Sequence, residues 1–373
     1  MTIDEVSAQL QSELRRSVSE ALSSRAPLLH HLNADSSWLL QIPRPQHAQS
    51  LGGRFYFNIL LDPWLSGGQS DVAKWFSQQF HAIPSAVPSI AAVEDLLRNV
   101  EFATSDIRQG KNQRPFEERE EVYKDDASFL DAIAISHEFT DHCHKETLLE
   151  IDPNVPVFAT EQAARLIDSW KHFRSVQTTP NFGGEVLDWR ACSLTPLPDW
   201  VSICRIVTPG DALYYHSALL IAFNNGHISE TTSDANEDES AEALIYTPHG
   251  IHADDLKCLP NADPEIRTLA FLHGLHDINI AKKQQLNLGA HNGLKAQRIL
   301  RAKYWIGTHD EVKQGGGLVS WFLNRKVINL HDALEEERKQ SLLEEGEKVV
   351  VGDANKGDVN WTELGNGESK VLV

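Results

Sequence analysis

The sequence predicts an α/β protein in which two mixed β-sheets carry helices on their outer faces. Strand-like and helix-like segments alternate along the 373 residues, and strand-like runs dominate from residue 38 to residue 61. No internal repeat of roughly 20–50 residues is present, which excludes a repeat architecture. Hydrophobic residues make up 41% and charged residues 23% of the chain, as in a soluble globular protein.

The expected elements follow from apolar runs and from the residues that end them. Apolar residues recur every three or four positions over residues 3–22, which predicts an amphipathic helix docked on the core, with a partner-binding helix as the alternative. Further helices are expected at residues 89–100, 161–170, 293–301 and 318–323, with a helical turn at 252–259. Strands are expected at residues 38–42, 55–61, 129–135, 157–160, 201–207, 213–223, 243–247, 266–272 and 304–307.

Three regions are expected along the chain. Residues 1–34 form an N-terminal helical extension, residues 35–330 the main domain and residues 331–373 an acidic tail. The N-terminus lacks the apolar core of a signal peptide, and no run of about 18 apolar residues predicts a membrane span. The four cysteines are scattered, which favours a reducing, cytoplasmic location over a disulfide framework.

The charge of the chain restricts its partners. The formal net charge of −19 repels phosphate backbones, so no nucleic-acid partner is expected. A small molecule is the expected partner, as a substrate. The most informative segment for its chemistry is residues 137–144 (HEFTDHCH), which follow the apolar run 129–135. Imidazole nitrogens and carboxylate oxygens are ligands for zinc, iron and manganese. The segment therefore predicts a divalent metal site at the end of a core strand.

Other histidines also follow apolar runs. His216 comes after residues 213–215, His249 after 244–247 and His309 after 304–307. If these strands lie side by side, their ends bring the histidines to the segment that holds His137 and His142. Structural interpretations stay open for each residue: a strand cap for His137, a helix N-cap for Asp141, a core histidine for His216, and turns for His249 and His309.

These residues, in this order, resemble the metallo-β-lactamase superfamily. Its hallmark, His-x-His-x-Asp-His, aligns with His137-x-Phe139-x-Asp141-His142, and its later metal ligands align with His216, His249 and His309. The resemblance covers roughly residues 35–325. It implies an αββα sandwich of two mixed β-sheets flanked by helices, with the metal where the sheet edges meet, and a supporting role for Asp62.

The chain departs from the family pattern at two positions. Phe139 replaces a histidine ligand, and His249 replaces an aspartate that bridges two metals. The resemblance then leaves His137 and His216 in a first site, and it leaves Asp141, His142 and His309, helped by His249, in a second. One ion is expected rather than two, with zinc favoured and iron or manganese as alternatives.

His144 is an addition to the pattern. If a helix starts at Asp141, His144 shares its face and would complete the first site or orient substrate. The Asp-His-Cys-His segment resembles a divergent branch of the superfamily from fungi and plants.

The expected activity is hydrolysis of an ester, lactone, thioester or phosphoester by a metal-activated water. Asp141 would orient the water, and His216, His137 or His144 would stabilise the oxyanion or protonate the leaving group. Two alternatives remain open. Loss of the two family ligands at Phe139 and His249 is also what a non-catalytic metal-binding or ligand-binding scaffold would show. Histidine and aspartate ligands equally suit an iron-dependent oxygen or redox enzyme.

Overall fold

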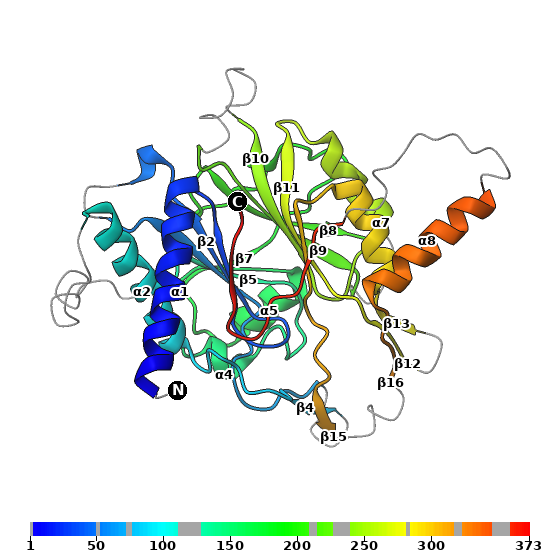
Figure 1. Cartoon of the computed structure of the whole chain (residues 1–373), viewed down its shortest axis with the longest axis horizontal. Helices are drawn as coiled ribbons and strands as arrows, with labels where there is room; N and C mark the ends of the chain where they lie inside the picture. Colours follow the sequence, from blue (N-terminus) through cyan, green and yellow to red (C-terminus); the bar gives the residue numbers. More distant parts are fainter. Residues whose placement is uncertain are drawn as a thin grey trace.

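The computed structural model describes residues 3–49, 53–71, 77–110, 128–208, 215–226, 239–280, 284–316, 323–344 and 359–373. Its two main sheets lie face to face (Figure 1). The seven-stranded sheet has the order β18-β1-β2-β3-β5-β6-β7, and the six-stranded sheet has the order β17-β14-β11-β10-β9-β8.

Both sheets are mixed. The first consists of β1 (Leu28–His31), β2 (Trp38–Pro43), β3 (Tyr56–Leu61), β5 (Ala132–Ile135), β6 (Val157–Ala159), β7 (Val176–Thr178) and β18 (Ser369–Val371). The second consists of β8 (Val201–Val207), β9 (Ser217–Phe223), β10 (Ala241–Thr247), β11 (Ile266–His273), β14 (Tyr304–Ile306) and β17 (Trp361–Thr362). Strands β3, β5, β6 and β7 are parallel, as are β10, β11, β14 and β17.

Alternation of side chains along the strands sorts the apolar residues into layers. In β9, Leu219 and Ile221 face the core between the sheets, whereas Leu220 faces the outer layer. In β3, Ile59 and Leu61 face the same core, and Leu60 points outward. Every strand that is buried on both faces therefore needs a cover on its outer side, and helices supply it.

Helices cover both outer faces. Helices α2 (Ile90–Arg108), α4 (Lys145–Leu148) and α5 (Glu161–Ser169) pack on the seven-stranded sheet. The 3₁₀ helix η3 (Ala253–Asn261) and α7 (Ala290–Leu300) pack on the six-stranded sheet, and α8 (Leu330–Glu344) contacts α7. The predicted αββα sandwich of two mixed sheets is confirmed.

The segments at the two ends belong to the sandwich. Helix α1 (Ile3–Ser24) is docked through buried Val18 and Ala21 against α2 and β1. Strand β18 pairs with β1, and β17 pairs with β14. The boundaries expected at residues 35 and 330 therefore do not separate β1, β17 and β18 from the sheets.

Some elements differ from their expected bounds. Strand β5 begins at Ala132 rather than at residue 129, and β9 begins at Ser217, directly after His216. Helix α2 continues to Arg108, past the end expected at residue 100. Residues 318–322 of the helix predicted at 318–323 lie outside the described residues. The last residue of that prediction, Leu323, begins strand β16 (Leu323–Lys326).

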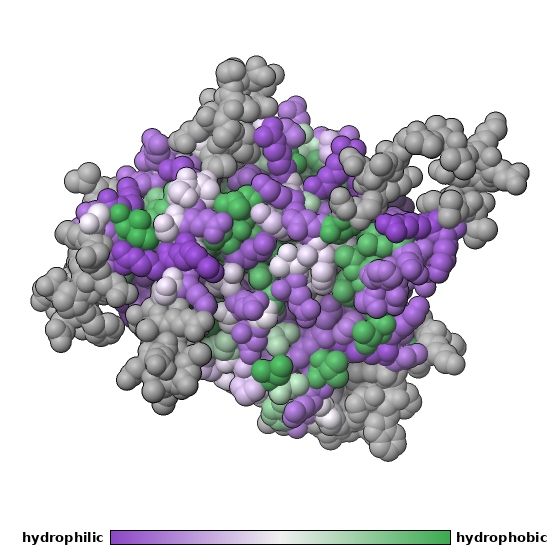
Figure 2. Space-filling view, viewed as in Figure 1, coloured by the Kyte–Doolittle hydropathy of each residue, from purple (hydrophilic) through white to green (hydrophobic). Residues whose placement is uncertain are grey.

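Smaller strand groups decorate the sandwich. Strand β16 forms a three-stranded sheet with β12 (Asp277–Ile280) and β13 (Gln284–Asn287), and β4 (Gln78–Phe80) pairs with β15 (Gln314–Gly316). On the face shown in Figure 2, hydrophobic residues form small separate patches among hydrophilic ones. None of the described helices is long and apolar enough to cross a membrane.

Candidate metal centre

Polar residues gather where parallel strands of both sheets end. Asp62 directly follows β3, the segment 136–144 follows β5, His249 follows β10 and His309 follows β14. The carboxyl ends of neighbouring parallel strands lie at one edge of a sheet, which places these side chains together. The centre is thus assembled from both sheets.

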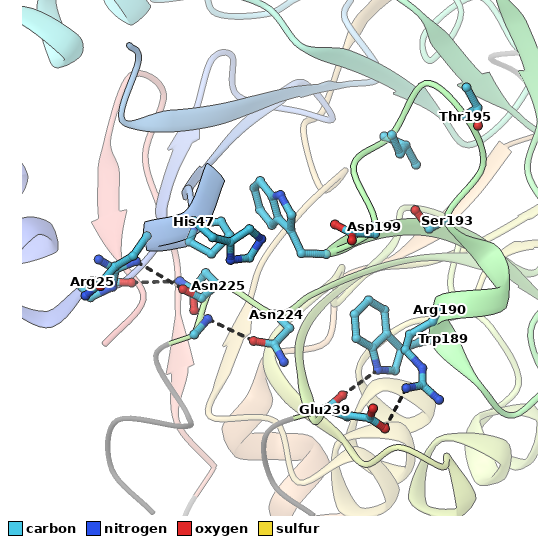
Figure 3. Close-up of a pocket in the computed structure, with 15 residues that line it drawn as sticks. Arg25, His47, Trp189, Arg190, Ser193, Thr195, Asp199, Asn224, Asn225 and Glu239 are labelled. Carbon is cyan, nitrogen blue, oxygen red and sulfur yellow. Dashed lines mark hydrogen bonds and ion pairs between the residues drawn. The ribbon is translucent and has the colours of Figure 1, made fainter. Parts of the chain in front are cut away.

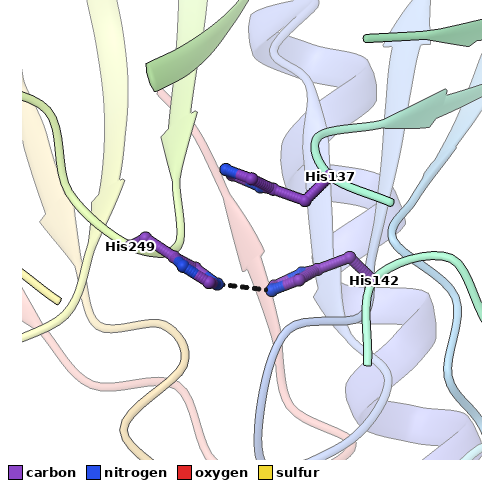
Figure 4. A group of neighbouring side chains, drawn as sticks. All are labelled: His137, His142 and His249. Carbon is purple, nitrogen blue, oxygen red and sulfur yellow. Dashed lines mark hydrogen bonds between the residues drawn. The ribbon is translucent and has the colours of Figure 1, made fainter. Parts of the chain in front are cut away.

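The first assembly is a three-histidine group of His137, His142 and His249, drawn in Figure 4. One ligand atom from each residue lies within 4.8 Å of the other two, and all three side chains are buried. Nε2 of His142 is 2.8 Å from Nε2 of His249. His137 and His142 come from the loop after β5 and His249 from the loop after β10, so the group spans the two sheets.

The second assembly is an aspartate group of Asp141, His142 and His309, which shares His142 with the first. Asp141 Oδ1 is 3.7 Å from His142 Nε2, and Asp141 Oδ2 is 3.9 Å from His309 Nε2. These three residues are the ones that the sequence predicted for the second site. His249, which was expected to assist them, lies instead in the three-histidine group with His137.

A buried carboxylate orients His142. Asp62 accepts hydrogen bonds from His142 Nδ1 (2.8 Å), from the Tyr246 hydroxyl (2.8 Å) and from the Ser136 amide (2.8 Å). The Ser136 hydroxyl also donates to it. The bond to Nδ1 fixes the ring and turns Nε2 toward the shared space, the usual support for a metal-binding histidine.

A second carboxylate orients His309. Asp35 is fully buried and accepts a hydrogen bond from His309 Nδ1 at 3.0 Å. Its other oxygen lies 2.8 Å from Lys313 Nζ, and the same ammonium donates to Asp141 Oδ2 at 2.7 Å. Lys313 therefore links the carboxylate that orients His309 with the carboxylate of the aspartate group.

Burial and charge shift the titration of these groups in opposite directions. Burial and the neighbouring His137 and His142 hold the pKa of His249 well below its usual value. Burial would also lower the pKa of His142, but the charges of Asp141 and Asp62 raise it overall. Burial opposes ionisation of Asp141, yet Lys313 and His142 hold its pKa well below the usual range. Asp141 is thus a carboxylate, as a ligand must be.

Aromatic rings enclose one side of the three-histidine group. Phe139 stacks on Tyr215 with ring centroids 5.1 Å apart, and Tyr215 stacks on His249 at 5.8 Å. The Tyr215 carbonyl oxygen lies 3.0 Å from His137 Nε2. Phe139 thus contributes apolar packing to the wall of the site.

Two predicted site residues lie outside both groups. His216 immediately precedes β9, and its ring centroid is 5.2 Å from that of His252. His144 is the N-cap of α4, where Nδ1 is 2.9 Å from the Thr147 hydroxyl. Neither residue is among the ligand atoms that the fold brings together, and their predicted catalytic roles stay predictions.

The donor set fits a divalent metal. Metal–ligand bonds of about 2.0–2.2 Å place two ligands of one ion roughly 3–4 Å apart, close to the separations found here. Two imidazole nitrogens 2.8 Å apart also need a proton or a metal between them, because two lone pairs repel. Nδ1 of His249 is buried without a hydrogen-bond partner. His142 and His249 are therefore suited to share an ion, and His137 completes the three-histidine group beside them.

Sequence reasoning identified Asp62 but missed four residues of the centre: Asp35, Tyr215, Tyr246 and Lys313. Asp35 lies in a polar loop and Lys313 in a charged segment, so both looked like solvated residues. Tyr246 lies within a strand pattern and resembled ordinary core. Only the approach of the two sheets brings them to the histidines.

A pocket of about 770 Å³ lies away from the histidines, beside the start of β8 and the end of β9 (Figure 3). Three of its charged side chains, Arg25, Arg190 and Glu239, are engaged with neighbouring residues. Arg25 donates to the carbonyl oxygen of Asn225 at 3.2 Å, and Arg190 pairs with Glu239 at 2.7 Å. None of the residues of the three-histidine group or the aspartate group lines this pocket.

No protein-family profile matches the sequence, and no curated protein sequence is significantly similar to it. Three solved structures illustrate the structural likenesses. A possible metal-dependent hydrolase from Veillonella parvula is 10% identical, with a TM-score of 0.49 over 93% of this chain and 99% of that one. An isothiocyanate hydrolase from Delia radicum gut bacteria is 13% identical, with a TM-score of 0.47 over 92% and 98%. The metallo-β-lactamase-fold protein YhfI from Bacillus subtilis is 13% identical, with a TM-score of 0.38 over 92% and 99%.

Proposed function

We propose that this chain is a metal-dependent hydrolase, a divergent member of the metallo-β-lactamase superfamily, with a divalent ion in the three-histidine group. The observation that carries the proposal is the convergence of His137, His142 and His249 from two sheets, with buried Asp62 orienting His142. Zinc is the ion we favour, because neutral imidazole is among its preferred ligands. The substrate class we favour is an ester, lactone, thioester or phosphoester.

A bound divalent ion supplies a water of lowered pKa and polarises an oxygen of the substrate. The chain supplies the remaining functions. Asp141 Oδ1 lies 3.7 Å from His142 Nε2, where it is placed to accept a proton from a water beside the group. Phe139 and Tyr215 exclude solvent from one side, which strengthens the electrostatic interactions there. His216 and His144 remain candidates for contacts to the leaving group.

The test is metal analysis joined to activity. The full chain is purified without added metal, and its zinc, iron and manganese are counted by mass spectrometry. Hydrolysis of p-nitrophenyl acetate, a thioester, a lactone and bis-p-nitrophenyl phosphate is measured before and after chelation. We expect a bound metal and at least one activity that chelation abolishes and added metal restores.

His142→Ala is the decisive variant, and His331→Ala is its matched control because the His331 side chain is 80% exposed on α8. We expect the first to lose metal and activity and the second to keep both. Metal-free wild-type protein would refute the proposed site. Bound metal without turnover of any of the four substrates would favour the scaffold, and iron with an optical spectrum would favour the redox enzyme.

A further inference from the structure

Lys313 occupies an unusual position for a surface-segment lysine. Its side chain is only 8% exposed, and its ammonium lies between two carboxylates, 2.7 Å from Asp141 Oδ2 and 2.8 Å from Asp35 Oδ2. The ammonium also lies 5.3 Å from the ring centroid of Trp64. The residue directly precedes β15, whose pairing with β4 anchors this segment. The lysine is therefore held in place from several sides.

The ammonium competes with a metal for the same oxygen. An ion bound between Asp141 Oδ2 and His309 Nε2, which are 3.9 Å apart, would need that oxygen. Asp141 Oδ2 is already bound by Lys313. A metal that bound this oxygen would have to displace an ammonium that has two buried carboxylate partners, and a metal bound through Oδ1 instead would be repelled by the ammonium beside it.

The charges of the groups that bond directly within the centre balance with a single divalent ion. Among groups that bond directly to the candidate ligands or to Lys313, three are carboxylates: Asp35, Asp62 and Asp141. One ammonium and one divalent ion neutralise three negative charges. Two divalent ions beside the ammonium would leave an excess of positive charge in a buried site, which is costly.

We propose that Lys313 is a built-in cation that takes the place of a second metal, so that the centre holds one divalent ion, in the three-histidine group. The inference rests on the proposed metal site and defines its stoichiometry. Lys313 and Asp35 then hold Asp141 and His309 in fixed positions beside the ion. The lysine is a positioning residue for Asp141, because it holds one carboxylate oxygen and leaves Oδ1 directed at His142.

The experiment starts from the metal-free full chain and measures how many ions each molecule binds. Zinc is titrated by calorimetry, and cobalt(II) is titrated optically, for the wild type and for Lys313→Met, which keeps the apolar length and removes the charge. We expect one equivalent in the wild type and two in Lys313→Met, the second binding more weakly. Lys257→Met is the matched control, since Lys257 is an exposed lysine that also pairs with an aspartate. It should bind one equivalent.

The outcomes separate this inference from the proposed function. Two tight equivalents in the wild type, or one equivalent in a folded Lys313→Met protein, would overturn the role of Lys313 and leave the hydrolase proposal intact. No binding by the wild type would overturn both. If Lys313→Met does not fold, the wild-type stoichiometry decides the question, together with Lys313→Ala refolded in excess zinc, for which two equivalents are expected.

Discussion

Replacing Asp62 with asparagine tests the structural logic of the centre most directly. Asp62 has φ of 41°, a left-handed conformation that asparagine also tolerates, so the backbone is preserved. The substitution exchanges one carboxylate oxygen for an NH₂ group. Every partner of the carboxylate is a donor in this structure, including His142 Nδ1 and the Ser136 amide. At least one donor must therefore face another donor.

The cost follows from these bonds. A buried donor without an acceptor costs about 1–3 kcal/mol. The bonds from His142 and from the Ser136 hydroxyl change from charge-assisted to neutral, which weakens each by about 1 kcal/mol. We expect Asp62→Asn to lower the free energy of unfolding by about 3–5 kcal/mol, and to weaken zinc binding by roughly 10–100-fold because His142 is no longer oriented.

Urea unfolding followed by circular dichroism, with chelator present, measures the first effect, and zinc titration measures the second. Asp168→Asn is the matched control, since Asp168 is exposed on α5 and forms a surface ion pair with Lys171. Its effect should stay within about 0.5 kcal/mol. A loss of less than about 1 kcal/mol for Asp62→Asn would refute the central role assigned to this carboxylate.

Three further predictions concern the same centre. Asp141 and Asp62 raise the pKa of His142 despite its burial, so a proton competes with the metal for this ring. Zinc affinity should therefore rise with pH by up to about tenfold per pH unit until His142 is deprotonated. Competition with a chromophoric chelator measures this affinity, and an affinity that does not change with pH would contradict the prediction. His144→Ala should remove the N-cap of α4 and cost about 0.5–2 kcal/mol in urea unfolding without changing metal content; a loss of metal would instead restore the ligand role predicted from sequence. Phe139→His places an imidazole beside the three-histidine group and should tighten zinc binding in calorimetry, whereas unchanged affinity would show that the ring cannot reach the ion.

Local patterns predicted most of the fold. Continuous apolar runs identified strands such as β3 and β10, because a strand buried on both faces is apolar at nearly every position. Bounds were less accurate where burial continues past the strand. Phe129 and Leu130 are buried but precede β5, so apolarity alone placed its start too early.

Which residues form the centre was partly predictable, but which of them lie together was not. Histidines at strand ends were visible in the sequence, and so were Asp141, His142 and His309 as neighbours. The grouping of His249 with His137 depends on how closely the two sheets approach, a long-range property without a local signal. The same holds for Lys313, whose ion pairs join segments more than 170 residues apart.

The pairing of residues 359–373 with both sheets has a consequence for aggregation. Strands β17 and β18 form one edge of each sheet and cover β14 and β1, respectively. Without them, β14 and β1 would expose unpaired backbone donors and acceptors, the template on which sheets of different molecules join. Both covering strands are very short, three residues or fewer, so the edges they present offer little room for a foreign strand. Residues 359–373 therefore cover one edge of each sheet. Protein cleaved before residue 359 should self-associate through the two uncovered strands.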